Sequence, residues 1–298
     1  MECPSQTRNG STSVFLAKDL PKIYDEVKIH DRELSGRLLK NWQASFFTNS
    51  PENGECNKQY LDIGCGPGNF TRHYLLPLCP PSMRRLVAAD NSYPMIDYAR
   101  RVHGHPKIEH RMLDIAIDDE VSRFIESEGQ FHRVYSFLTF HWMHDKGAAL
   151  RNVERLLAVG GECLIVFNPH PGPLQLSKAM MNSDRWKEYS HVLKNVVPEF
   201  PDTHDPSYLR NYLIDIVRST SLVPLTCELV QVEAPSSSLE EVTRMALSVN
   251  PLYSLVTEEE KVELASFAKK FMEQGHYSNY SCTGTTRKLR FVFHGYKP

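Results

Sequence analysis

Short apolar runs alternate with amphipathic segments through the middle of the chain. The apolar runs are four or five residues long and the segments between them show helical spacing. Strict alternation of strand and helix predicts parallel strands joined by right-handed crossovers, hence an α/β fold with a doubly wound sheet. The expected strands are 60–63, 86–89, 108–112, 134–137 and 163–167, and the expected helices are 70–78, 94–102, 119–126 and 146–157.

The pattern differs at both ends of the chain. A helical pattern from 16 to 47 ends at the turn-rich residues 50–54, and the alternation stops after Asn168. We expect an N-terminal helix, two further strands that complete a seven-stranded sheet, and C-terminal helical insertions that cap the site. We expect residues 1–13 to be mobile and residues 14–298 to form a single domain, with a cofactor-binding half (50–167) and a capping half (168–298). In the capping half we expect helices at 174–181, 186–197, 208–219 and 239–274, and strands at 223–232 and 289–296.

Composition narrows the class of partner. The 298 residues are 41% hydrophobic and 23% charged, and the net charge of -2 argues against nucleic acid, which usually requires a basic surface. The seven cysteines are odd in number and form no C-x-x-C pair, which favours reduced thiols in the cytoplasm. The sequence has no apolar stretch near the length of a membrane span. We expect a small-molecule partner and a monomer or homodimer.

One glycine-rich segment, Asp62-Ile63-Gly64-Cys65-Gly66-Pro67-Gly68, follows the first expected strand. Glycines at this spacing allow a tight turn and a close approach of the backbone to a ligand. A dinucleotide fingerprint would need glycine where Asn69 stands, and the acid Asp62 would repel a pyrophosphate. Asp62 instead suits the ammonium group of S-adenosylmethionine, and we predict Asp62, Gly64, Cys65, Gly66 and Gly68 as cofactor-binding residues.

Two further acids follow the next two expected strands. Asp90 ends the second strand and suits the ribose hydroxyls, and Asp114 with Ile115 follows the third and suits the adenine. Each acid alone is also a common helix cap. Their joint occurrence with the glycine segment predicts S-adenosyl-L-methionine as the cofactor.

The run Phe131-His132-Arg133-Val134-Tyr135-Ser136-Phe137-Leu138-Thr139-Phe140-His141-Trp142 resembles the insect juvenile hormone acid methyltransferase family, as do Asn91-Ser92-x-x-Met95-Ile96 and Asn250-Pro251. The resemblance implies a Rossmann-like class I methyltransferase fold. It also implies methyl transfer to the carboxylate of a sesquiterpenoid such as farnesoic acid or juvenile hormone acid. We add Asn91, Met95, Ser136 and Phe137, which lie in these segments, to the predicted cofactor-binding residues.

In that family a glutamine of the N-terminal helix and the tryptophan of the His-Trp pair hold the substrate carboxylate. Trp142 matches the tryptophan and His30 falls closest to the glutamine, so both are predicted catalytic residues. A carboxylate is already ionised at neutral pH, so the reaction needs a dry, orienting chamber rather than a base. His141 and His144 lack a third ligand, and we expect no metal. Two alternatives stay open: methylation of another small-molecule O or N nucleophile, or a catalytically silent cofactor-binding paralogue.

Overall fold

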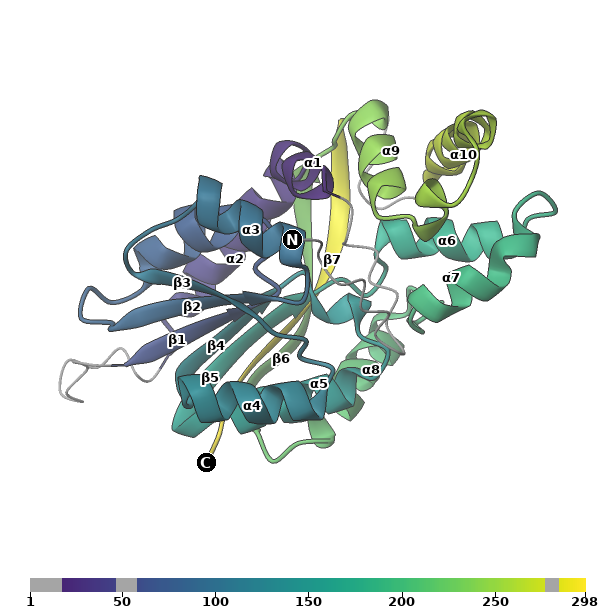
Figure 1. The fold of residues 1–298 in the computed structure, drawn as a ribbon. Coiled ribbons are helices and arrows are strands. Elements are labelled where there is room, and N and C mark those ends of the chain that lie inside the picture. The colour runs from purple at the N-terminus through teal and green to yellow at the C-terminus, as the bar shows by residue number, and fades with distance from the viewer. Residues whose placement is uncertain (1–17, 47–57, 277–283) are drawn as a thin grey trace.

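A computed structural model describes residues 18–46, 58–276 and 284–298 (Figure 1). Seven strands form one sheet in the order β3-β2-β1-β4-β5-β7-β6. The first five are parallel, and β7 lies antiparallel between β5 and β6. This confirms the predicted doubly wound sheet of seven strands: β1 (Gln59–Ile63), β2 (Arg85–Asp90), β3 (Ile108–Met112), β4 (Phe131–Phe137), β5 (Leu157–Phe167), β6 (Val223–Pro235) and β7 (Thr285–Tyr296).

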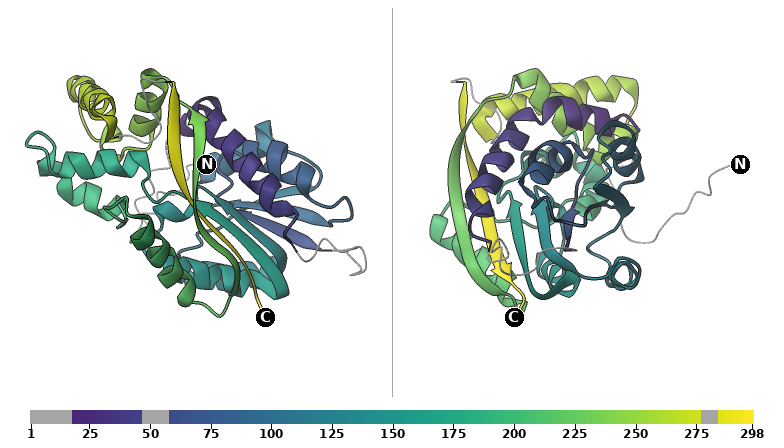
Figure 2. Two further views of the ribbon diagram at one scale, coloured as in Figure 1. Left: turned by 180° about the vertical axis from the view of Figure 1, so that it is seen from behind. Right: turned by 90° about the vertical axis from the view of Figure 1, so that its left-hand side faces the viewer.

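Helices cover both faces of the sheet, as Figure 1 and Figure 2 show. On one face lie α2 (Ile29–Gln43) and α3 (Tyr93–Val102). On the other face lie α4 (Asp118–Glu128), α5 (Lys146–Leu156) and α8 (Pro206–Arg218). Residues 70–78 form a π-helical turn, Thr71–Leu75, and a 3-10 turn, Leu76–Leu78, rather than a regular helix, because Pro77 lacks the backbone N–H that would continue it.

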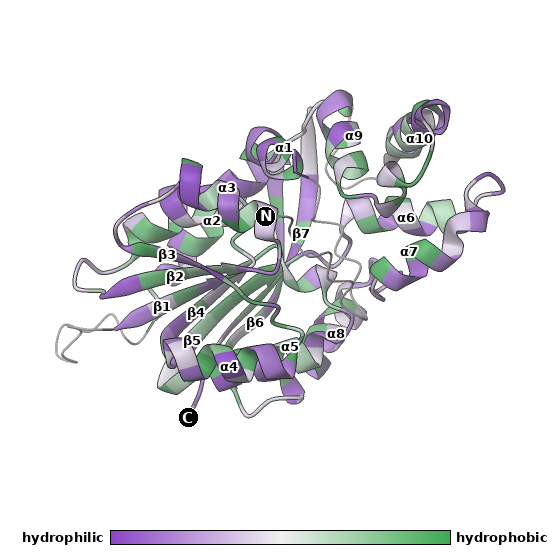
Figure 3. Ribbon diagram, in the orientation of Figure 1, coloured by the Kyte–Doolittle hydropathy of each residue, from purple (hydrophilic) through white to green (hydrophobic). Residues whose placement is uncertain are grey.

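The core follows the two-residue period of the strands. In β1 the side chain of Tyr60 packs toward α2, while Leu61 and Ile63 pack toward α4 and α5. Figure 3 shows green apolar segments along the middle of the sheet, and helices on which green apolar and purple polar segments alternate. Burying each large apolar side chain stabilises the fold by about 1.5–3 kcal/mol, so the sheet is a rigid base for loops at its edge.

The N-terminal helical pattern is broken at Lys28. It forms two helices, α1 (Leu20–Val27) and α2, instead of the single helix that the sequence suggested. The Arg32 guanidinium donates to the carbonyls of Tyr24 (3.1 Å) and Asp25 (2.7 Å), which lie in the last turn of α1. The break lets α1 turn and pack against α3 and α9 (Leu239–Ser248).

A second apolar core lies beyond the sheet. It joins α6 (Gly172–Met181), α7 (Ser190–Val196), α9 and α10 (Glu258–Phe271), with Trp186 and Met180 fully buried among them. Figure 1 shows these helices gathered at one end of the sheet, where β6 and β7 rise past α1. They are the expected capping helices. The short 3-10 turn Lys187–Tyr189 lies between α6 and α7, Pro251–Ser254 lies between α9 and α10, and the π-helical segment Met272–His276 follows α10.

The expectations for residues 1–13 and for the turn 50–54 fall outside the described residues. Within the described ranges, Cys65, Cys79, Cys163 and Cys227 are free thiols. None of the helices in these ranges combines the length and apolarity needed to cross a membrane.

Candidate active site

A pocket of about 120 Å³ opens at the carboxyl end of β1. Open α/β sheets bind their ligands at this edge, where neighbouring strands diverge. Four segments far apart in the sequence form the walls: the α1–α2 break, the glycine turn, the end of β4 and the loop after β5. Its lining comprises Tyr24, Lys28, Asp31, Arg32, Ser35, Asp62, Gly64, Cys65, Gly66, Pro67, Asn69, Phe70, Phe137, Leu138, His141, Trp142, Asn168, Pro171, Gly172 and Pro173.

The glycine turn is shaped by two different constraints. A Cβ on Gly64 would lie 2.0 Å from Thr139 Oγ1, so only glycine fits beneath the β4 loop. At Gly66 the φ angle is +53°, and an added Cβ would meet no atom of the described residues within 4 Å. Gly66 therefore holds a left-handed backbone that faces open space, which is the geometry of a backbone approached by a ligand.

Asp62 is buried at the end of β1. Its Oδ2 accepts a hydrogen bond of 2.5 Å from the Thr71 hydroxyl. Burial, together with the charge of Asp90, raises the pKa of Asp62 to about 7. The carboxylate is thus held in a place that suits a neighbouring positive charge.

Asp90 ends β2 beside the same turn. Its carboxylate accepts from the backbone N–H of Gly66 (2.9 Å) and of Ser92 (2.9 Å). Burial raises its pKa to about 6, with a further contribution from Asp114. Asp114 in turn accepts from the Asn91 amide at 3.2 Å, so acids from the ends of three neighbouring strands meet at one edge.

These features fit a cationic, nucleotide-like cofactor. Among the described residues, the charges that act on Asp62 are those of another carboxylate, and those that act on Asp90 include Asp114. Buried carboxylates without a cation are unfavourable unless a bound ligand supplies the charge. S-adenosylmethionine carries an ammonium and a sulfonium, so its charges match this edge, and the open space at Gly66 gives it access to the turn.

The predicted cofactor residues fall into two groups. Asp62, Gly64, Cys65, Gly66 and Phe137 line the pocket. The remaining ones lie outside its lining: Asp90, Asn91 and Asp114 beside the turn, Gly68 against Ala99, Ser136 donating to the Ile63 carbonyl (3.0 Å), and Met95 and Ile115 with side chains in apolar clusters.

The two predicted catalytic residues are separated by the structure. Trp142 lines the pocket from the 3-10 turn Phe140–Trp142, with its ring 5.5 Å from that of His141. His30 is absent from the lining, and its Nδ1 lies 3.6 Å from a Glu33 carboxylate oxygen. Lys28, in the break before α2, and Asp31, in the first turn of α2, line the pocket, whereas His30 lies on another side of that turn.

Several lining residues were missed by sequence reasoning. Three of them carry buried polar atoms without a hydrogen-bond partner in the described part of the chain: Ser35 Oγ, His141 Nδ1 and Asn168 Oδ1. Burial, and then the charge of Lys28, lowers the pKa of His141 well below its ordinary value, so its ring is neutral at pH 7. Such orphaned groups mark a place where a polar ligand binds.

A buried charge cluster stands behind the pocket. Asp31 accepts from Lys28 (3.0 Å), Lys288 (2.9 Å) and Arg290 (3.1 Å), so three cations share one carboxylate. Burial opposes ionisation of Asp31, but these three charges hold its pKa well below the ordinary value. One signal for Asp31 was present in the sequence, since it falls on the same helical face as Leu34 and Leu38.

The first residue after β4, Leu138, has a strained backbone conformation. Leu138 has a φ angle of +57°, which is rare for a branched side chain. Its N–H donates to the Val166 carbonyl at 2.7 Å, which holds the strained turn on β5. This turn aims the following residues, His141 and Trp142, over the glycine turn.

Comparison with known proteins agrees with this geometry. Residues 61–165 match the methyltransferase domain family. A structure described as loganic acid methyltransferase with SAH has a TM-score of 0.61 at 10% identity, covering 92% of this chain and 96% of the other. The [4+2]-cyclase SpnF has a TM-score of 0.50 at 12% identity, covering 97% and 98%. Residues 61–165 therefore match a methyltransferase domain, whose cofactor is S-adenosylmethionine, and the chain shares its fold with these solved structures.

The chain is also similar to juvenile hormone acid O-methyltransferases, which confirms the predicted resemblance to that family. It is 30% identical to that of Bombyx mori over 146 residues, 49% of this chain and 51% of the relative. It is 31% identical to that of Drosophila melanogaster over 139 residues, 46% of each. The matched part of the chain thus spans about half the length of these relatives.

Proposed function

We propose that this protein transfers the methyl group of S-adenosylmethionine to the carboxylate of an apolar small-molecule acid. The observation that carries the proposal is the joining of two opposite electrostatic surfaces in one pocket. Asp62, beside the glycine turn, supplies an acidic group to the lining, and Lys28, which is hydrogen-bonded to Asp31, supplies a basic group. The first suits a cationic cofactor and the second suits an anionic acceptor.

The cofactor would lie along the carboxyl ends of β1 to β3. Asp62 would face its ammonium, Asp90 its ribose, and Asp114 with the backbone of Ile115 its adenine. When bound, S-adenosylmethionine supplies an electrophilic methyl group on a sulfonium. The contribution of this chain is then to orient the acceptor oxygen and to exclude water from it.

The acceptor carboxylate would be held by Lys28, His141 and Trp142. Lys28 uses one N–H on Asp31 and has two more to offer. His141 stays neutral because of its burial, so it acts as a hydrogen-bond partner and leaves the charge to Lys28. Lys28 replaces His30 in this role.

The rest of the pocket suits a greasy chain. Phe70, Phe137, Leu138 and Pro171 supply apolar walls, with the Phe70 and Phe137 rings 4.7 Å apart. An apolar acid, such as the juvenile hormone acid in the names of the insect relatives, would place its chain against these walls and its carboxylate at Lys28. Apolar walls with few polar groups are typical of small-molecule sites.

The test is methyl transfer from labelled cofactor to farnesoic acid, juvenile hormone acid and dodecanoic acid, with farnesol as a matched control without a carboxylate. The acids are expected to be methylated and farnesol is not. Cofactor binding by calorimetry without turnover on any acid would overturn the proposal. It would favour a silent binding protein, and the cyclase likeness shows that this fold is not confined to methyl transfer.

A lysine variant locates the carboxylate. Lys28→Met is expected to raise KM for the acid roughly tenfold or more, because a charged hydrogen bond is lost. Lys22→Met, in an exposed residue of α1, is the matched control and is expected to leave KM unchanged. An increase in KM for His30→Gln, with none for Lys28→Met, would show that His30, and not Lys28, binds the acceptor carboxylate.

A further inference from the structure

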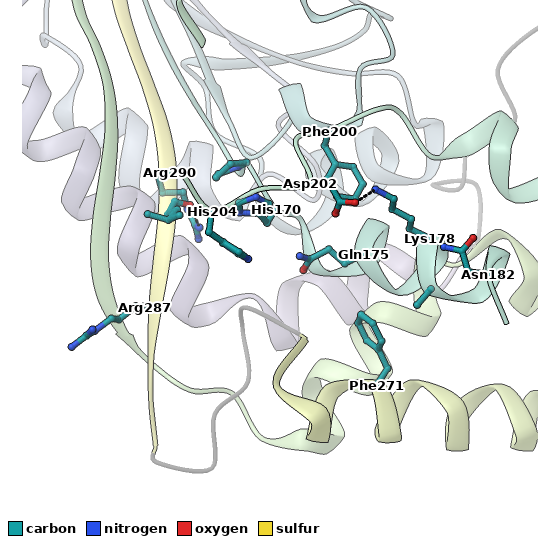
Figure 4. A pocket seen from close by; sticks show the side chains of 13 residues that line it. His170, Gln175, Lys178, Asn182, Phe200, Asp202, His204, Phe271, Arg287 and Arg290 are labelled. Atoms are coloured by element: carbon teal, nitrogen blue, oxygen red, sulfur yellow. Dashed lines mark hydrogen bonds and ion pairs between the residues drawn. The ribbon is translucent and has the colours of Figure 1, made fainter. Parts of the chain in front are cut away.

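A second pocket, of about 540 Å³, lies across residues 168–173 from the first. Pro169 and His170 line it, whereas Asn168 and Pro171 line the first pocket, so the loop after β5 is a wall between the two. The remaining lining comes from α6, the loop before α8, Phe271 and β7 (Figure 4). Its size is that of a small-molecule site.

Positive and titratable groups dominate this second pocket. Lys178 from α6 and Arg290 from β7 line it, and the rings of His170 and His204 lie between them, tilted by 47° with their centroids 4.4 Å apart. Figure 4 shows the two imidazoles beside Arg290, while Arg287 points to the other side of β7. The one carboxylate among its lining residues is Asp202.

Arg290 is the group in this pocket best suited to bind an anion. It is 3% exposed, and it donates through Nη2 to Asp31 (3.1 Å) and through Nη1 to the Leu289 carbonyl (2.9 Å). Its Nε has no hydrogen-bond partner in the described ranges. Asp31 is also shared with Lys288 and Lys28, so the positive charge of Arg290 is only partly neutralised. A buried guanidinium with a spare N–H is a strong donor for an oxyanion.

The pKa of Asp202 shows that the electrostatic potential at the mouth of the pocket is positive. The Lys178 ammonium lies 2.9 Å from its Oδ2, as drawn in Figure 4. The hydrogen bond and charge of Lys178, helped by His170 and His204, lower the pKa of Asp202. A carboxylate is thus stabilised in this place even though the Asp202 side chain is 83% exposed.

We propose that this second pocket is an oxyanion-binding site, which takes the carboxylate or phosphate group of a small molecule. Arg290 anchors the anion at the closed end, and Lys178 holds it at the mouth in competition with Asp202. The loop after β5 separates this site from the proposed methyl-transfer pocket, although Arg290 donates to Asp31, which lines that pocket. Anion binding is measured without any turnover.

The test is titration of the full chain with inorganic phosphate and, in a parallel arm, with sodium acetate. Binding is followed through the imidazole NMR signals of His170 and His204. Lys178→Met is expected to weaken binding about fivefold, and Arg290→Met roughly tenfold or more. Asp202→Asn is expected to tighten binding roughly two- to fivefold, because it frees Lys178.

The exposed pair Lys187–Asp184, 2.8 Å apart, supplies matched controls. Lys187→Met and Asp184→Asn are expected to leave binding unchanged. A response to phosphate alone or to acetate alone supports the site and identifies its anion. The proposal is overturned if neither anion moves the imidazole signals, or if Lys178→Met and Asp202→Asn bind as the wild type does; both substitutions are near the surface, so this result holds even if Arg290→Met fails to fold.

Discussion

Substituting Gly66 with alanine separates backbone strain from cofactor recognition. At φ +53° an alanine is expected to lose about 1–2 kcal/mol of folding free energy. Gly160, in β5, has φ +74°, and its added Cβ likewise meets no atom of the described chain within 4 Å. Gly160→Ala therefore carries a similar strain at a position outside the pocket lining.

The two variants differ in what the new methyl group occupies. On Gly66 it projects into the open space beside Asp62 and Asp90, in a pocket of only about 120 Å³. Overpacking of this kind costs about 1–3 kcal/mol, equivalent to roughly five- to 150-fold in affinity. Gly160→Ala is expected to bind the cofactor as the wild type does.

Calorimetry with S-adenosylhomocysteine gives the affinities, and urea unfolding gives the two stabilities. The expected result is a similar loss of stability in both variants and a loss of affinity in Gly66→Ala alone. Unchanged affinity in Gly66→Ala would show that the ligand does not approach this turn. An equal loss of affinity in both would show that strain, and not the site, controls binding.

Three further predictions follow from the buried charges and the pocket wall. Because burial raises the pKa of Asp62 to about 7, the cofactor-free native state holds a proton that the unfolded chain has released. The stability from Asp62 is therefore full below about pH 4 and is lost as the pH rises toward 7. In urea unfolding, Asp62→Asn is expected to lack this dependence of stability on pH, and equal dependences in the two proteins would contradict the prediction. The affinity of the wild type for the cofactor is expected to rise between about pH 6 and pH 8. Asp31→Asn leaves Lys288 and Arg290 buried without their carboxylate and is expected to lose about 3–5 kcal/mol in urea unfolding, whereas a loss under about 1 kcal/mol would show that the cluster is solvated. Trp142→Phe keeps an aromatic side chain but replaces the indole, and with it the N–H, by a phenyl ring. KM for the acid is expected to rise with cofactor affinity unchanged, and steady-state kinetics showing no rise would assign Trp142 to packing.

The acidic edge was predictable because its chemistry is local. Asp62 and Asp90 lie at the ends of β1 and β2, Asp114 follows β3, and parallel strands bring their carboxyl ends to one edge. Gly64 and Gly66 lie in the turn that the same pattern marks. The alternation of elements therefore fixed both the doubly wound sheet and the location of the cofactor edge.

The basic side of the site was not predictable in the same way. Asp31 and Lys288 are separated by 257 positions and meet because β7 inserts antiparallel between β5 and β6. His30 and Lys28 are two positions apart, and a break between α1 and α2 decides which one reaches the pocket. The spacing of hydrophobic residues in the sequence indicates neither the position of β7 in the sheet nor the break between the two helices.

The sequence by itself determined the strand and helix order, the glycine turn and the acids beside it, since these depend on hydrophobic period and on turn chemistry over a few residues. Only the tertiary structure decided that Lys28 and His141 line the same pocket as Asp62 and that Arg290 lines another. These contacts join segments far apart in the chain, and their geometry depends on how whole helices and strands pack.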